Sequence, residues 1–182
     1  IKSCDDDTEL MGKVLQHAEG VKEANPSFYR DLIDMAEKDE TQNLVLTRKV
    51  IDLVRRKIMR RHVTIQSFSP LVCGFVRAEA PELRVELLAH VDADSKMTWE
   101  QWERWAFLMR VHGFNCNYKA LTEGRLESLQ EAGLTVSPYT VNELEDMKRL
   151  VAWGVDGIIS DKPDLALSQS KTVNRAGGPK KQ

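Results

Sequence analysis

Apolar positions recur at helical spacing along the first third of the chain. An acidic stretch precedes apolar residues between Leu10 and Leu15, a pattern that predicts a helix start. Pro26 opens a second predicted helix, and residues 44–60 form a third with one apolar face. The first third of the chain is therefore predicted to be helical.

From residue 62 onward the pattern changes to short β-branched segments that alternate with helical ones. Strands are expected at residues 62–68, 83–90, 114–118 and 134–140, with a short last one at 155–160. The helices between them are expected at residues 69–78, 98–111 (ended by Gly113), 122–132 (capped by Gly133) and 143–153 (closed by Gly154). Such alternation predicts parallel strands with helical crossovers, hence an α/β fold. A complete (β/α)8 barrel needs about 250 residues, so the pattern leaves either a small open sheet or half of a larger fold.

Composition narrows the class of protein. Hydrophobic residues make up 42% of the 182 residues and charged residues 30%, a balance typical of a soluble globular chain with one core. The net charge of -2 and pI near 6.1 argue against a nucleic-acid-coating protein. No apolar run reaches the roughly 20 residues that a membrane span requires.

The cysteines and the first residues bear on location. Cys4, Cys73 and Cys116 are far apart and odd in number, which predicts neither a disulfide framework nor a metal site but buried thiols in a reducing compartment. The chain starts at Ile1 without a signal-peptide pattern. We therefore expect a cytoplasmic protein that begins upstream of Ile1, where any signal would lie.

Three motifs point to a family. Residues 133–142 end in Tyr139-Thr-Val-Asn, and residues 154–164 read Gly-Val-Asp-Gly-Ile-Ile-Ser-Asp-Lys-Pro-Asp. These two segments resemble, in this order, the final two strands of glycerophosphodiester phosphodiesterases, and Val63-Thr-Ile-Gln-Ser-Phe-Ser-Pro resembles the fifth strand of that family. Ile1-Lys2 resembles the end of the family's Glu-x-Lys motif. The resemblance covers residues 62–166 well and residues 1–20 loosely, with Tyr139 in place of the usual tryptophan.

The resemblance implies a partial TIM-type (β/α) barrel, from the end of strand 4 to strand 8. Residues 1–167 would form this C-terminal part of the barrel, and residues 168–182 a disordered tail. The segment 20–61 is longer than one crossover helix needs, so it is expected to hold a helical insertion without an assigned function. Half a barrel leaves open sheet edges, which predicts that the chain is incomplete.

The resemblance also implies an activity. The family hydrolyses glycerophosphodiesters to sn-glycerol 3-phosphate and an alcohol with a divalent cation, Mg²⁺ or Ca²⁺. Its His-Arg-Gly, Glu-x-Asp and second histidine motifs would lie upstream of this chain, and so would the metal ligands. One alternative is a non-catalytic barrel remnant that binds a lipid surface or a protein partner. A secreted phospholipase-D-like enzyme is a further rival that the cysteine pattern disfavours.

The implied site has one catalytic residue and four substrate-binding residues in this chain. By resemblance Lys2 would stabilise charge on the phosphate, with an ordinary terminal lysine as the alternative. Since barrel active sites form at the carboxyl ends of strands, the substrate-binding candidates are Gln66, Phe68, Asn117 and Tyr139. Tyr139 would lie against the glycerol, whereas core packing is the favoured alternative for Phe68.

Three other features invite a functional interpretation. His90, with Asp92 and Asp94 behind it, resembles a metal or acid–base site, although a structural histidine is favoured. Three tryptophans, spaced every third residue from Trp99 to Trp105, indicate a packed helix face rather than a membrane stripe. The basic stretch 48–61 could contact anionic lipid or nucleic acid, and a solvated helix face is the simpler explanation.

Overall fold

A computed structural model describes residues 8–17, 26–38 and 41–176. The chain divides into two compact units, an N-terminal unit of residues 1–114 and a C-terminal unit of residues 115–182. Length alone favoured a single core, whereas each unit buries its own set of apolar side chains. Within the described ranges each unit also buries one cysteine, Cys73 in the N-terminal unit and Cys116 in the C-terminal unit.

The N-terminal unit contains five helices and a parallel strand pair in its described ranges. The helices are α1 (Thr8–His17), α2 (Pro26–Lys38), α3 (Gln42–Arg56), α4 (Pro70–Glu79) and α5 (Trp99–Leu108). Strand β1 (Thr64–Ser67) pairs in parallel with β2 (Arg84–Ala89), with Gln66 opposite Glu86. Strand β3 (Gly113–Cys116) follows in the order β1-β2-β3, and the boundary between the units falls within it. The predicted α/β class is confirmed.

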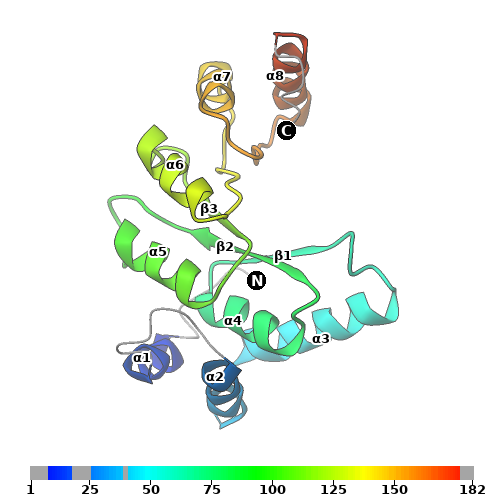
Figure 1. The fold of residues 1–182 in the computed structure, drawn as a ribbon, viewed down its shortest axis with the longest axis vertical. Helices are drawn as coiled ribbons and strands as arrows, with labels where there is room; N and C mark the ends of the chain where they lie inside the picture. The colour runs from blue at the N-terminus through cyan, green and yellow to red at the C-terminus, as the bar shows by residue number, and fades with distance from the viewer. Residues whose placement is uncertain (1–7, 18–25, 39–40, 177–182) are drawn as a thin grey trace. The chain divides into compact units, whose positions relative to one another are not determined.

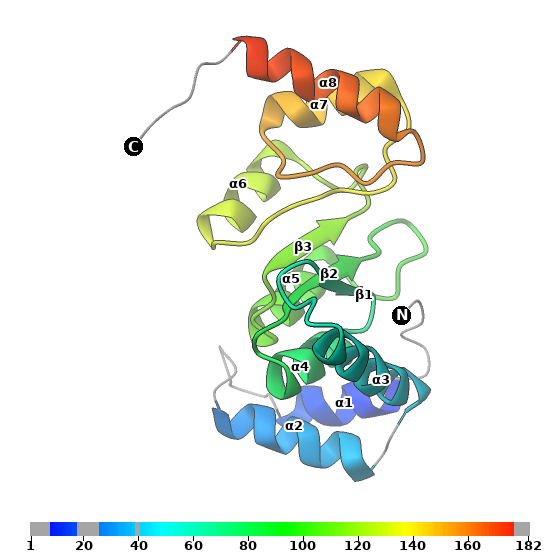
Figure 2. The ribbon, with the colours of Figure 1, turned by 90° about the vertical axis from the view of Figure 1, so that its right-hand side faces the viewer.

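Helix α4 is the centre of the N-terminal unit. It packs on β1 and β2 with one side and contacts α2 and α3 with the other, while α1 contacts α2 (Figures 1 and 2). Pro70 occupies its first turn and Ser69 caps it by accepting a hydrogen bond from the Val72 N–H at 3.4 Å. Residues 70–76 are all buried, as expected for a helix between a sheet and other helices.

Helix α5 buries the three tryptophans. A capping box at Thr98 and Gln101 starts the helix, because each residue's side chain accepts a hydrogen bond from the other's backbone N–H. Trp99 contacts Phe114 edge-to-face, with ring centroids 5.2 Å apart. Trp99, Trp102 and Trp105 are each at most 5% exposed, so the predicted packed face is confirmed.

The C-terminal unit contains α6 (Glu123–Glu131), α7 (Leu144–Trp153) and α8 (Pro163–Ala176) among its described residues. Three extended segments lie between the helices and share backbone hydrogen bonds. The Tyr139 N–H donates to the Cys116 carbonyl at 2.9 Å, and the Ile159 N–H donates to the Pro138 carbonyl at 3.0 Å. The segment 136–141 therefore lies between 115–118 and 156–160, as neighbouring parallel strands of a barrel would.

The two last predicted strands are less regular than expected. Among the described residues, 134–140 forms single bridges instead of a strand, one of them the parallel bridge between Asn117 and Tyr139, and 155–160 forms no named strand. Their hydrogen bonds alternate with side-chain contacts, such as the Val136 N–H to the Asp156 carboxylate at 2.8 Å. Side chains thus replace part of the regular ladder.

Four helices end with the same backbone motif. In α3, the Met59 N–H donates to the Val54 carbonyl and the Ile58 N–H to the Arg55 carbonyl, while Ile58 takes a left-handed φ of 55°. This is the Schellman motif, whose left-handed position usually holds glycine. Helices α6 and α7 carry the predicted glycines there, Gly133 (φ 82°) and Gly154 (φ 86°). Helix α5 carries Arg110 (φ 48°) at the equivalent position.

Three sequence-based boundaries are wrong. The helix predicted over 44–60 ends at Arg56, and the helix predicted over 98–111 ends at Leu108, because non-glycine residues adopt the left-handed turn. Residues 168–182 were expected to be disordered, but α8 continues to Ala176, with Pro163 and Asp164 in a favourable first turn. Residues 177–182 lie outside the described residues.

Candidate functional site

Gln66 lies in a hydrogen-bonded row on strands β1 and β2. Its Nε2 donates to Glu86 Oε2 at 2.9 Å, and Arg84 Nε donates to Glu86 Oε1 at 2.9 Å. The Glu86 side chain is only 11% exposed, so this carboxylate depends on both donors. The row gives the sheet a polar strip that combines a carboxamide, a carboxylate and a guanidinium.

This strip lies on the sheet face opposite α4. Ile65 and Ser67 are buried, and the Cys73 thiol of α4 approaches the Ser67 carbonyl at 4.0 Å. Because strand side chains alternate, Gln66 and Phe68 belong to the other face, where both are half-buried. The position of Phe68 therefore fits a ring beside a binding surface as well as it fits packing, and its substrate role stays a prediction.

Asn117 and Tyr139 are neighbours in the C-terminal unit. They form the isolated parallel bridge, and the Tyr118 N–H donates to the Tyr139 carbonyl at 2.9 Å. The Asn117 carboxamide oxygen accepts from the Lys119 N–H at 3.1 Å, which ends the strand in a tight turn. Both side chains are half-buried. Two of the four predicted substrate-binding residues are thus brought together here.

Asn142 joins the two C-terminal motifs. Its Nδ2 donates to Asp161 Oδ2 at 2.9 Å, and its Oδ1 accepts from the Asp161 N–H at 3.0 Å and from Ser160 Oγ at 3.2 Å. The Ser160 hydroxyl in turn accepts from the Lys162 N–H at 2.9 Å. The asparagine of Thr-Val-Asn is therefore bonded to the serine and aspartate of Ser-Asp-Lys-Pro, at the carboxyl ends of both segments.

A second set of polar residues fixes the opposite ends of these segments. Asp156 accepts from the Val136 N–H at 2.8 Å and from Gln130 Nε2 at 3.1 Å. Asn115, which is fully buried, accepts from the Ser137 N–H at 2.8 Å. These bonds hold the segment 136–141 between its neighbours and so determine where Tyr139 and Asn142 lie.

His90 belongs to a local loop at the end of β2. Its Nε2 lies 2.9 Å from Asp92 Oδ2, and its carbonyl accepts from the Trp102 indole N–H at 3.0 Å. The Asp94 N–H donates to the Asp92 carboxylate at 3.0 Å, so Asp92 closes its own turn. This arrangement agrees with the structural interpretation of His90.

The described ranges contain no cluster of three or more histidine, cysteine, aspartate or glutamate side chains able to hold a metal ion. Lys2, the predicted catalytic residue, lies outside the described residues. In those ranges, no helix has the length and apolar character needed to cross a bilayer.

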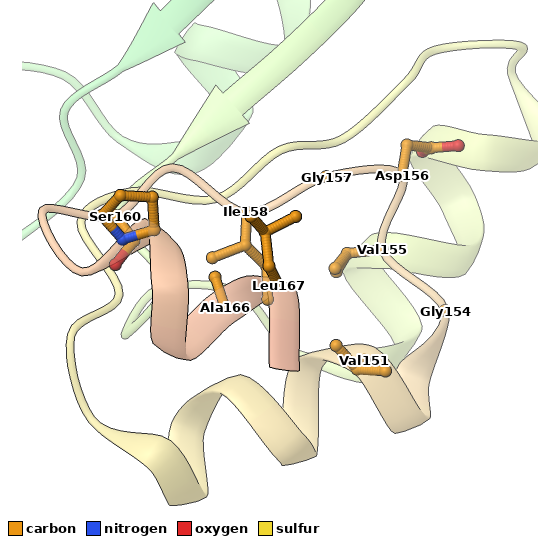
Figure 3. A pocket seen from close by; sticks show the side chains of 10 residues that line it. Val151, Gly154, Val155, Asp156, Gly157, Ile158, Ser160, Ala166 and Leu167 are labelled. Carbon is orange, nitrogen blue, oxygen red and sulfur yellow. The ribbon is translucent and has the colours of Figure 1, made fainter. Parts of the chain in front are cut away.

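A cavity of about 590 Å³ in the C-terminal unit is lined by α7, α8 and the segment 154–160 (Figure 3). Val151, Val155 and Ile158 contribute apolar side chains, and Leu167 lies beside them. The cavity contains none of the predicted substrate-binding residues and is mostly apolar. It is therefore a poor match for a phosphodiester.

Sequence reasoning missed several polar residues of these networks. Glu86 interrupts an otherwise apolar strand, Val85-Glu-Leu-Leu-Ala, and a lone acid in such a run was a signal for a buried partner. Asn142 and Asp161 lie inside the two C-terminal motifs that carry the family resemblance, but the sequence alone assigned neither residue a hydrogen-bond partner. Their mutual bonding required knowledge that the two segments are neighbours.

The chain is similar to known proteins over most of its length. The model of the glycerophosphoryl diester phosphodiesterase family matches residues 7–165. The chain is 32% identical over 121 residues to a glycerophosphodiester phosphodiesterase of Bacillus subtilis, an alignment that covers 64% of this chain and 41% of that protein. The chain thus spans less than half the length of this curated relative.

Solved structures agree with this result. A Silicibacter pomeroyi protein, provisionally named glycerophosphoryl diester phosphodiesterase, is 26% identical with a TM-score of 0.62, over 70% of this chain and 44% of that one. A glycerophosphodiester phosphodiesterase from Parabacteroides distasonis shares the fold at 17% identity, with a TM-score of 0.59 over 88% of this chain and 72% of that one. With a family model that matches most of its length, this chain belongs to the glycerophosphoryl diester phosphodiesterase family.

Proposed function

We propose that the protein to which this chain belongs hydrolyses glycerophosphodiesters to sn-glycerol 3-phosphate and an alcohol. The observation that supports this most is the family match over residues 7–165. We further propose that the chain corresponds to the end of strand 4 through strand 8 of a TIM-type barrel. The parallel order of the segments 115–118, 136–141 and 156–160 supports that assignment.

In this proposal the chain contributes substrate-binding groups. Tyr139 would place its ring against the glycerol, and Asn117 beside it would offer a carboxamide to the glycerol hydroxyls or phosphate. Gln66 would act in the same way from β1, where Glu86 fixes its orientation. Lys2 would stabilise negative charge on the phosphate.

The proposed divalent cation, Mg²⁺ or Ca²⁺, does not fit the described residues, because they hold no suitable carboxylate or imidazole cluster. We therefore derive no catalytic step through the metal from this chain. The proposal assigns its ligands, together with the catalytic histidines, to sequence outside these 182 residues.

The experiment measures glycerol 3-phosphate release from glycerophosphocholine. The 182-residue chain is assayed with Mg²⁺ or Ca²⁺, and so is a chimera in which it replaces the matching C-terminal part of the Bacillus relative. The chain alone should release no product, and the chimera should release product until a chelator is added. Turnover by the chain alone would overturn the assignment of the catalytic groups to other sequence.

A binding measurement separates loss of catalysis from loss of the site. Amide NMR of the isotope-labelled chain, titrated with glycerol 3-phosphate, should shift the side-chain carboxamide signals of Gln66 and Asn117. The side-chain carboxamide signal of Asn174, a residue outside the candidate site, serves as an internal reference in the same spectrum. A folded chimera without turnover, combined with no shift at either carboxamide, would contradict the hydrolase and favour the non-catalytic remnant.

A further inference from the structure

An exposed surface on the N-terminal unit combines apolar and cationic side chains. Four of the five large hydrophobic side chains most exposed in the described ranges lie within fourteen consecutive positions. They are Leu46 (46% exposed), Leu53 (49%), Ile58 (79%) and Met59 (45%). Exposed apolar groups concentrated in this way mark a site of interaction rather than ordinary surface.

Cations surround these side chains. We call the whole set the basic–apolar surface, and it consists of Leu46, Lys49, Leu53, Arg56, Lys57, Ile58, Met59, Arg60 and Arg61. All five of its lysines and arginines are exposed. Asp52 is the one acid in the sequence between residues 41 and 78. The surface therefore carries a strong local positive charge, although the whole chain has a net charge of -2.

Helix geometry places the two kinds of side chain on one stripe. Leu46 and Leu53 are seven residues apart, which returns them to the same side of α3, and Lys49 lies between them at helical spacing. Asp52 is turned about 100° from Leu53 around the helix axis. The core side of α3 is separate, since it buries residues such as Leu44, Ile51 and Val54.

Other cations of this helix already have structural partners. Arg55 donates to Glu82 at 2.8 Å and to the Glu79 carbonyl at 2.7 Å, and it joins α3 to the loop before β2. Arg48 lies over the Phe75 ring at 5.1 Å from its centroid. These contacts fix α3 on the unit, and with it the part of the basic–apolar surface that α3 carries.

The turn after α3 extends the surface outward. Ile58 is the left-handed residue of the Schellman motif, and a β-branched residue rarely adopts this conformation. It is nevertheless the most exposed apolar side chain of the set. The end of α3 protrudes from the N-terminal unit in Figure 1, and none of the described helices and strands of that unit lies over it in Figure 2.

We propose that the basic–apolar surface binds the surface of an anionic phospholipid bilayer. A bilayer interface accepts both features, because apolar side chains enter the acyl boundary while cations contact anionic headgroups. A nucleic acid would use the cations but leave Leu46, Leu53 and Ile58 in water. This binding is independent of the proposed hydrolysis and requires no catalytic residue.

The test is co-sedimentation of the 182-residue chain with vesicles. Phosphatidylglycerol–phosphatidylcholine vesicles should bind it, and phosphatidylcholine vesicles should bind it far less, with binding reduced by added salt. Inorganic phosphate at the same ionic strength should not displace it. Equal binding to both vesicle types, displacement by phosphate, or no binding to either would overturn the proposal.

Variants separate the apolar part from the charge. Ile58→Gly should lower vesicle binding about tenfold. Because glycine suits the left-handed backbone at this position, the midpoint temperature of thermal unfolding should not fall. Arg60→Gln with Arg61→Gln should lower binding about fivefold per charge. The matched control removes two exposed cations elsewhere, Arg104→Gln with Lys148→Gln, and should retain binding.

A single-stranded oligonucleotide provides the competing outcome. In that outcome the oligonucleotide binds the chain, and binds it less tightly when Arg60→Gln and Arg61→Gln are combined. If Ile58→Gly then changes the binding of neither the oligonucleotide nor the vesicles, the surface acts through charge alone. That result would overturn the bilayer proposal. Loss of vesicle binding on Ile58→Gly, with an unchanged fold by circular dichroism, supports insertion of the apolar side chain.

Discussion

Asn142 and Asp161 bond to each other through both side chain and backbone, with the Asn142 amide 2.9 Å from the Asp161 carboxylate and the Asp161 N–H 3.0 Å from the Asn142 carboxamide oxygen. These residues are nineteen positions apart, on either side of α7. One asparagine therefore closes the βα unit that contains Tyr139 and supports its position.

Removal of this closure should destabilise the C-terminal unit. Asn142→Ala leaves the Asp161 N–H and Ser160 Oγ without their acceptor, which is expected to lower the free energy of unfolding by about 1–2 kcal/mol. Urea unfolding followed at Trp153, the one tryptophan after residue 114, measures the change in this unit. Glu143→Ala is the control, since its carboxylate is 73% exposed and should matter little. Equal midpoints for both variants would contradict the assigned role.

The row on β1 and β2 predicts coupling between Arg84 and Glu86. Arg84→Met removes one hydrogen-bond donor from the largely buried Glu86 carboxylate, which should lower the free energy of unfolding by roughly 1–2 kcal/mol after allowance for the exposure of Arg84. Arg84→Met with Glu86→Leu should recover most of that loss, because no buried charge is left. Chemical unfolding of both single variants and the double variant measures the coupling energy, and strictly additive losses would show that the two side chains act separately.

The stability of the N-terminal unit should fall in mild acid. Burial lowers the pKa of His112, and the nearby Arg77 guanidinium and Arg84 lower it further, against an opposing effect of the Val85 backbone and Glu86. Since the folded pKa lies below the ordinary value of 6.5, the unfolded chain takes up the proton first as the pH falls. This contribution to stability is therefore complete above about pH 6.5 and is lost as the pH falls toward the folded pKa.

Denaturant unfolding at a series of pH values tests the role of His112. His112→Gln should flatten the pH dependence between neutrality and mild acid, whereas His62→Gln, a change at an exposed histidine of the same unit, should retain it. A slope that persists in His112→Gln would assign the effect to other groups.

The shared helix-end motif predicts opposite effects at two positions. Gly133→Ala should destabilise the chain by about 1 kcal/mol, because its φ of 82° is costly for a side chain although no atom lies within 4 Å of the added Cβ. Arg110→Gly should stabilise it by a similar amount, since φ is 48° there. Thermal unfolding of the two variants measures both signs, and a shift in the same direction for both would mean that backbone conformation is not the cause.

The sequence predicted the kinds of element well because most of them follow from periodicity. The tryptophans of α5 and the first-turn proline of α4 are local signals, and the structure confirms both. The ends of α3 and α5 were misplaced because Ile58 and Arg110 adopt a conformation that sequence assigns to glycine. Those turns are fixed by hydrogen bonds to the preceding helix rather than by the residue's own preference.

The candidate site was predictable only in part. Asn117 and Tyr139 were named from the carboxyl ends of predicted strands, and the structure makes them neighbours. Gln66 was named too, but its partner Glu86 was not, because a cross-strand pair depends on register, which one strand's pattern does not determine. Lys2 stays a prediction, since it lies outside the described residues.

The buried cysteines give each unit its own reporter of local opening. Burial raises the pKa of Cys116 to about 12 and raises that of Cys73 as well, so both thiols stay protonated and shielded in the folded chain. A thiol reagent can then modify either one only when its surroundings open. In a Cys4→Ser background, the modification rate at Cys73 would follow the N-terminal unit and the rate at Cys116 the C-terminal unit. Two modification rates measured on one chain would thus show whether the two units open together or separately.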